Sequence, residues 1–113
     1  MTEKPAKRAP KHLQAETRRW FRYVVAEWGL EPHHIRILTA ACESWDRCCQ
    51  AREVIDREGL TYLDRFKAPR ARPEISIERD SRLAFLRAVR ELDLDVEPPT
   101  QPGRPRGLSS NRG

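Results

Sequence analysis

Three cysteines and two histidines lie close together near the middle of the sequence, and their residue types would suit a zinc ion. Their spacing does not. Cys42 and Cys49 would stand two helical turns apart, about 10 Å, which is too far for one ion. Cys48 points away from its neighbour Cys49, and neither a CxxC nor an HxxxH pair accompanies His33 and His34. We therefore expect no metal and no cofactor, and cysteines that pack as small buried hydrophobic residues.

Nucleophilic catalysis has little support either. A reactive cysteine needs an adjacent base and a partly exposed, electropositive site. Arg47 and Arg52 lie near Cys48 in the chain, but no motif places a histidine beside it. None of the five glycines has the spacing of a phosphate-binding loop. We therefore expect a protein that is not an enzyme.

The charge pattern favours a polyanionic partner. The net charge is +5, and most of the excess Lys and Arg lies near the two ends. A nearly neutral body with basic arms is typical of nucleic-acid-binding proteins, although basic tails also simply keep small proteins in solution. Charge alone does not decide between these two interpretations.

Three basic segments are candidate DNA-binding surfaces: an N-terminal arm, a loop within residues 60–73 and a C-terminal tail. The residues expected to contact phosphates are Lys7, Arg8, Arg65, Lys67, Arg70, Arg72, Arg104 and Arg106. The tail contains Gly-Arg-Pro at 103–105, the centre of minor-groove hooks. Because Pro102 stands where such a hook carries Arg, generic phosphate contact is the stronger hypothesis.

Hydrophobic periodicity predicts a mainly α fold with three helices around these segments. The stretch from Pro32 to Leu60 should form a long central helix of about 27 residues, because apolar side chains recur in it at steps of three and four. A first helix is expected over about 14–28, antiparallel to the central helix across a short link. A third helix should run from just after Pro73 to about Leu92. Residues 60–73 should form a short β-hairpin or irregular loop.

Opposite charges mark the third helix at i,i+3 and i,i+4 spacing. The residues in this mesh are Glu78, Arg79, Asp80, Arg82 and Arg87. Such pairs stabilise an exposed helix face. We therefore expect the mesh to lie on the outer, solvated side of the helix.

One folded domain is expected at residues 13–96, between a disordered basic arm at 1–12 and a disordered tail rich in Pro and Arg at 97–113. So small a core often gains stability from oligomerisation. Three tryptophans carry much of the apolar surface. Core packing is their more common use, and as candidates for a subunit interface we name Trp20, Trp28 and Trp45.

The setting expected for this chain is intracellular. No apolar run is long enough to span a membrane, and the N-terminus lacks the apolar segment of a signal peptide. Three cysteines make an odd count that gives no sensible disulfide framework, which fits a reducing compartment.

The middle of the chain resembles the P27 family of phage terminase small subunits. The resemblance covers roughly residues 13–96 and is carried by the order and spacing of several short motifs. These are LTAACESWDR at 38–47, Ala51-Arg52, Gly59-Leu60-Thr61, Arg72-Pro73, ERDSRLAF at 78–85 and RELDL at 90–94. The Gly-Arg-Pro of the tail is also similar to the tails of such proteins.

The resemblance implies a non-enzymatic part of a DNA-packaging motor, encoded by a phage or prophage and acting in the cytoplasm of the bacterial host. Proteins of this family assemble as rings, engage viral double-stranded DNA and deliver it to a large subunit that holds the ATPase and nuclease. One departure is that no helix-turn-helix with a clear recognition helix can be identified here. A non-enzymatic interaction scaffold and a small dimeric DNA-binding regulator remain alternatives.

Overall fold

The computed structural model describes residues 8–94 of the 113-residue chain. Its elements are α1 (Ala15–Glu27), α2 (Pro32–Glu58), β1 (Thr61–Leu63), β2 (Pro69–Ala71) and α3 (Pro73–Leu92). The mainly α fold, with a long second helix and a short hairpin before the third, is therefore confirmed. The C-terminal tail and most of the N-terminal arm, including Lys7, Arg104 and Arg106, lie outside the described residues.

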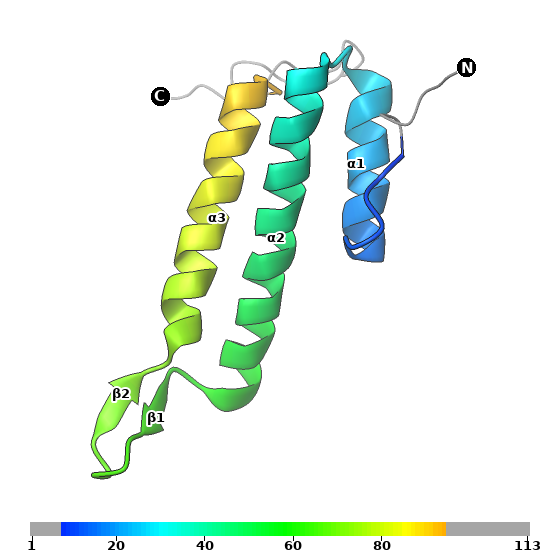
Figure 1. Ribbon diagram of the computed structural model, residues 1–113. Coiled ribbons are helices and arrows are strands. Elements are labelled where there is room, and N and C mark those ends of the chain that lie inside the picture. Colours follow the sequence, from blue (N-terminus) through cyan, green and yellow to red (C-terminus); the bar gives the residue numbers. More distant parts are fainter. Residues whose placement is uncertain (1–7, 95–113) are drawn as a thin grey trace, which may run out of the picture.

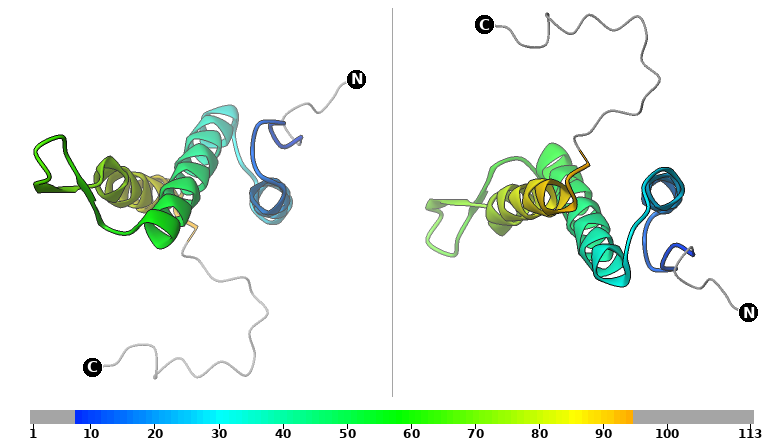
Figure 2. Two further views of the ribbon diagram at one scale, coloured as in Figure 1. Left: turned by 90° about the horizontal axis from the view of Figure 1, so that it is seen from below. Right: turned by 90° about the horizontal axis from the view of Figure 1, so that it is seen from above.

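Helix α2 lies between the other two helices, and both of them run antiparallel to it (Figure 1). Helix α3 runs alongside α2 over most of its length, whereas the shorter α1 lies beside the N-terminal part of α2. The views along the helices show α1 and α3 on different sides of α2 (Figure 2). The antiparallel arrangement predicted for the first two helices is confirmed. Within residues 8–94, no helix is long and apolar enough to cross a membrane.

The two ends of α2 follow the signals in its sequence. Pro32 is its first residue, where a missing N–H costs nothing. Gly59 follows its last turn with a φ of 92° and donates its N–H to the carbonyl of Ile55 at 2.8 Å. Residues that have a Cβ atom rarely adopt this backbone conformation, so a glycine ends the helix here.

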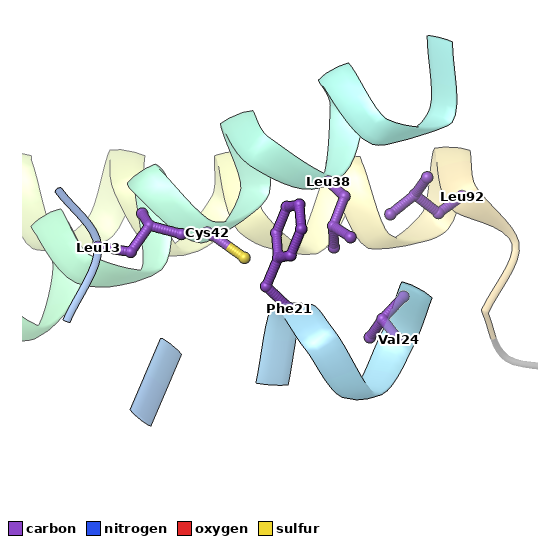
Figure 3. Close-up of a cluster of buried hydrophobic side chains, with 6 residues drawn as sticks. All are labelled: Leu13, Phe21, Val24, Leu38, Cys42 and Leu92. Atoms are coloured by element: carbon purple, nitrogen blue, oxygen red, sulfur yellow. The ribbon is translucent and has the colours of Figure 1, made fainter. Parts of the chain in front are cut away.

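The core forms where α1, α2 and the end of α3 meet (Figure 3). Its buried members are Leu13, Phe21, Val24, Leu38, Cys42 and Leu92. The ring of Phe21 points from α1 toward α2 and lies between Leu38 and Cys42 in Figure 3. Cys42 and Cys48 are buried free thiols. The prediction that cysteines of α2 pack as small hydrophobic residues is confirmed for Cys42, which belongs to the core, whereas the buried Cys48 thiol donates a hydrogen bond to Glu78.

Asp46 of α2 joins the first helix to the second. Its carboxylate accepts the Gln14 N–H at 2.8 Å and the Thr17 hydroxyl at 2.5 Å, at the start of α1. Gln14 is the N-cap residue of α1 but supplies no capping hydrogen bond of its own. A carboxylate from another helix therefore satisfies a backbone donor that would otherwise have no partner, and its negative charge complements the helix dipole.

Glu78 of α3 joins the third helix to the second. Its carboxylate accepts hydrogen bonds from Arg52 of α2 at 2.9 Å and from Arg82 of α3 at 3.4 Å, and the Cys48 thiol lies 3.6 Å away. The Arg82 and Arg52 guanidinium groups hold the pKa of Glu78 below its usual value. The expectation that the charge mesh of α3 lies on the outer face is wrong for Glu78, because its side chain is only 9% exposed and faces α2.

Asp64 organises the turn between the two strands. One of its carboxylate oxygens accepts the N–H groups of Phe66 and Ala68 at 2.8 and 3.0 Å, and the other accepts the Arg70 guanidinium at 3.0 Å. The hydrogen bond from the Asp64 N–H to the Ala68 carbonyl at 3.0 Å closes a loop of residues 65–67, and Lys67 takes the left-handed conformation with a φ of 63° that is usual at the end of such a three-residue loop. The hydrogen bond from Ala68, then those from Arg70 and Phe66, keep the pKa of Asp64 below its usual value.

Candidate nucleic-acid interface and aromatic pocket

The β-hairpin extends beyond the ends of α2 and α3 (Figure 1). All six residues of its two strands are exposed. A lone two-stranded hairpin has little stability in water unless a third element covers it, and the helices of this chain do not cover the strands. Packing against the helices therefore does not restrict which residue types can stand in the two strands.

The register of the hairpin gives it two different faces. Residues paired across the strands point to the same side, and the pairs are Thr61 with Ala71, Tyr62 with Arg70 and Leu63 with Pro69. One side, which we call the basic face, carries Tyr62, Arg70 and Arg72. The other side, which we call the apolar face, carries Thr61, Leu63, Pro69 and Ala71 and has no charge.

The four basic residues predicted for this loop are brought together, but their charges are not equally available. Arg70 forms an ion pair with Asp64 at 3.0 Å. Arg72 is half-buried, and its guanidinium lies 6.0 Å from the centre of the Tyr62 ring. Arg65 lies over the ring of Phe66 at 5.2 Å, and neither it nor Lys67 forms an ion pair with another residue of the described part of the chain. The tip therefore presents two uncompensated positive charges.

Arg8 is exposed but lies apart from the hairpin. The N-terminal segment that contains it runs beside α1, whereas the hairpin lies beyond α3 (Figures 1 and 2). The structure thus unites four of the five predicted basic residues that it describes and separates the fifth from them.

An aromatic pocket lies between the three helices. Trp20 of α1, Trp45 of α2 and Phe85 of α3 line it together with Glu16 and Thr17, and it has a volume of about 270 Å³. The ring of Phe85 lies 5.7 Å from that of Trp20 and 5.0 Å from that of Trp45, centre to centre. Trp45 remains 41% exposed, which is a large open apolar surface for a tryptophan.

Only two of the three tryptophans named as interface candidates meet at this pocket. Trp28 lies near the opposite end of α1, where it packs against the core and makes an edge-on contact with Tyr23 at 5.9 Å. Phe85 was not among the candidates, because its place in the sequence shows only that it lies beside the apolar stripe of its own helix. Its contacts with two other helices appear only when the chain is folded.

The thiols of α2 are poorly suited to nucleophilic chemistry. Burial raises the pKa of Cys42 to about 12, with further contributions from Asp46 and Glu43. Burial also raises the pKa of Cys48, as does the neighbouring Glu78. Both groups therefore stay protonated near neutral pH, whereas nucleophiles and metal ligands require the thiolate.

A family model described as the small subunit of phage terminase matches residues 15–99. The matched segment begins at the first residue of α1 and includes all three helices and the hairpin. No curated protein and no solved structure matches the chain.

Proposed function

The chain belongs to the family of phage terminase small subunits, and on this premise we propose that it binds viral double-stranded DNA and delivers it to the large terminase subunit for genome packaging. In this proposal it acts as a homo-oligomeric ring in the cytoplasm of the bacterial host. The chain is then not an enzyme, and the ATPase and nuclease belong to the large subunit. The observation that supports the proposal most is the basic hairpin, which lies inside the matched segment and outside the packed helices.

The hairpin suits DNA in shape as well as in charge. A two-stranded ribbon fits the major groove of B-DNA, which is about 12 Å wide. Arg65 and Lys67 at its tip are available for phosphates, and Arg70 and Arg72 follow along the basic face. Exposed Arg and Lys side chains of this kind bind phosphates with little dependence on sequence.

Arg8 and the basic residues outside the described part of the chain are proposed as a second set of contacts. Lys7 adjoins Arg8 in the N-terminal arm, and Arg104 and Arg106 lie in the C-terminal tail. Extended arms of this composition can follow the DNA backbone beside the site that the hairpin occupies.

Salt dependence of DNA binding tests this assignment. We expect the double variant Arg65→Gln, Lys67→Gln to lose about two phosphate contacts for each bound subunit, so that the log–log slope of affinity against salt becomes about 1.8 shallower. Fluorescence anisotropy with a labelled duplex measures that slope. The matched control is Arg79→Gln with Arg87→Gln, which removes the same charge from α3. Equal slopes for the two double variants would show that the tip does not contact phosphate.

The proposed ring uses apolar surface at Trp20, Trp28 and Trp45. The open side of Trp45 supports this, because a large aromatic side chain gains most when a partner covers it. Light scattering on the full chain measures the mass of the assembly. We expect a closed ring of many subunits, whereas a dimer would favour a small DNA-binding regulator.

A further inference from the structure

We propose that the apolar face of the hairpin of one subunit binds in the aromatic pocket of a second copy of this chain. The proposal names the contact that builds the ring, and for its biological meaning it rests on the function proposed above. It also divides the hairpin between two partners, because the basic face stays free for DNA while the apolar face is covered by protein.

Within residues 8–94, the apolar face of the hairpin is not covered by any other element. Its largest side chain, Leu63, is 64% exposed, and Pro69 lies directly across from it. No charged residue interrupts this face, because the one charge within the two strands, Arg70, points to the other side. A small uncharged surface on a hairpin that needs a third element to stabilise it is suited to burial against protein.

The aromatic pocket offers a matching surface. Trp20, Trp45 and Phe85 form its apolar wall, and three rings around a concave site suit a branched aliphatic side chain such as Leu63. Glu16 adds a negative charge at this site and is exposed. Arg65 and Lys67 at the hairpin tip adjoin both faces of the hairpin, so the tip can lie against Glu16 in the ring and still reach phosphate, and the two surfaces complement each other in charge as well as in apolar character.

A hairpin cannot reach the pocket of its own subunit. Trp45 and the end of α2 at Glu58 are thirteen helical residues apart, or about 20 Å. The hairpin begins only after that end, is held by α2 and α3 together, and points away from the helices (Figure 1). A hairpin that fills this pocket must therefore come from another molecule.

The two surfaces also lie at different places on the subunit. A contact between unlike surfaces repeats from copy to copy in one direction, and it closes into a ring when the rotation between copies allows. A contact of this kind differs from a symmetric dimer, in which the same patch meets itself. That difference gives the proposal a specific test.

The test mixes two variants that each lack one half of the contact. Leu63→Asp disables the hairpin but leaves the pocket intact, and Trp45→Lys disables the pocket but leaves the hairpin intact. We expect each variant alone to be monomeric, and an equal mixture to form one-to-one dimers, because just one intact contact can form. Native mass spectrometry identifies the dimer by its mass, and circular dichroism checks that both variants remain helical.

Charge reversal supplies a second test. It changes exposed residues, whose substitution should not disturb folding. Glu16→Arg and Arg65→Glu should each weaken association about 5- to 10-fold at low salt, and the two together should return it to within about 2-fold of the natural chain. This pair decides the matter if Trp45→Lys fails to fold.

Three results would overturn the proposal: a monomeric natural chain, single variants that assemble normally, or a folded mixture that stays monomeric without rescue by the charge reversal. The DNA-binding function fails separately. A natural ring with no affinity for DNA would refute the DNA-binding function and leave the contact between hairpin and pocket standing. DNA binding by the natural chain, with no dimers in the mixture of variants, would refute the contact and leave the function standing.

Discussion

Acidic residues have different roles in the helical body and in the hairpin. In the body, Asp46 and Glu78 are buried acids, and each pairs with groups on a different helix. In the hairpin, Asp64 only shapes its own turn, and the strands on either side leave every residue exposed. Packing within the chain accounts for residues of the first kind. Packing against the helices does not explain the residue types of the hairpin strands, so we interpret these strands as sites of contact outside the subunit.

Removing an aromatic ring from each region should give the largest contrast. Phe21→Ala leaves a cavity in the core and should lower the free energy of unfolding by about 3–5 kcal/mol. Phe66→Ala, at a residue that is 76% exposed, should change it by less than about 0.5 kcal/mol. Urea unfolding measured by circular dichroism compares the two. Similar losses would mean that the hairpin is part of the folded core.

Removing the carboxylate that joins α1 to α2 should have a smaller but clear effect. Asp46→Ala takes the acceptor from the Gln14 N–H and from the buried Thr17 hydroxyl, at an expected cost of about 1–3 kcal/mol. Asp46→Asn keeps one acceptor oxygen and should lose less. The same urea titration measures both, and an unchanged midpoint for Asp46→Ala would show that α1 does not depend on this cap.

Glu78 should make stability depend on pH in a defined direction. Because its pKa is lowered in the folded chain, its contribution is present above the ordinary value of 4.5 and is lost as pH falls through the lower folded value. Glu78→Gln should therefore cost about 1 kcal/mol near pH 7 and progressively less below pH 4.5. Unfolding free energies across this pH range test the prediction. A difference that stays constant with pH would contradict it, and Asp80→Asn on the exposed side serves as a control.

The smallest expected change concerns DNA binding rather than folding. Asp64→Asn keeps an oxygen for the Phe66 and Ala68 N–H groups but removes the charge that neutralises Arg70. We expect duplex affinity to rise about 2- to 5-fold at low salt, together with a small loss of stability near neutral pH, because the lowered pKa of Asp64 means that its charge stabilises the folded turn. Fluorescence anisotropy at two salt concentrations measures the rise. A fall in affinity would indicate that Asp64 serves DNA binding mainly by holding the turn together.

The boundaries of the helices could be predicted because the signals are local. Pro32 and Gly59 define the ends of α2, and the change of pattern after Gly59 predicts the hairpin. Three-residue and four-residue steps of apolar side chains also identify the long central helix. All of these depend on residues that are near one another in the chain.

The partners of Asp46, Glu78 and Phe85 could not be predicted in the same way. Glu78 and Arg82 have the spacing of an exposed pair on one helix, and nothing in that spacing shows that Arg52 of α2 completes a buried cluster. Phe85 likewise meets two tryptophans from other helices only after folding. The basic residues of the hairpin were identified from composition alone, but their division into two faces depends on the strand register.

A chain without the hairpin tests most directly whether this segment makes the external contacts of the subunit. Residues 61–71 would be replaced by a short Gly-Ser linker, with circular dichroism as a check that the three helices remain. We predict that duplex affinity at about 100 mM salt falls at least about 10-fold, because the remaining basic arms bind phosphates without the hairpin cations. Affinity equal to that of the natural chain would contradict the account and would place DNA binding on the helices or the arms.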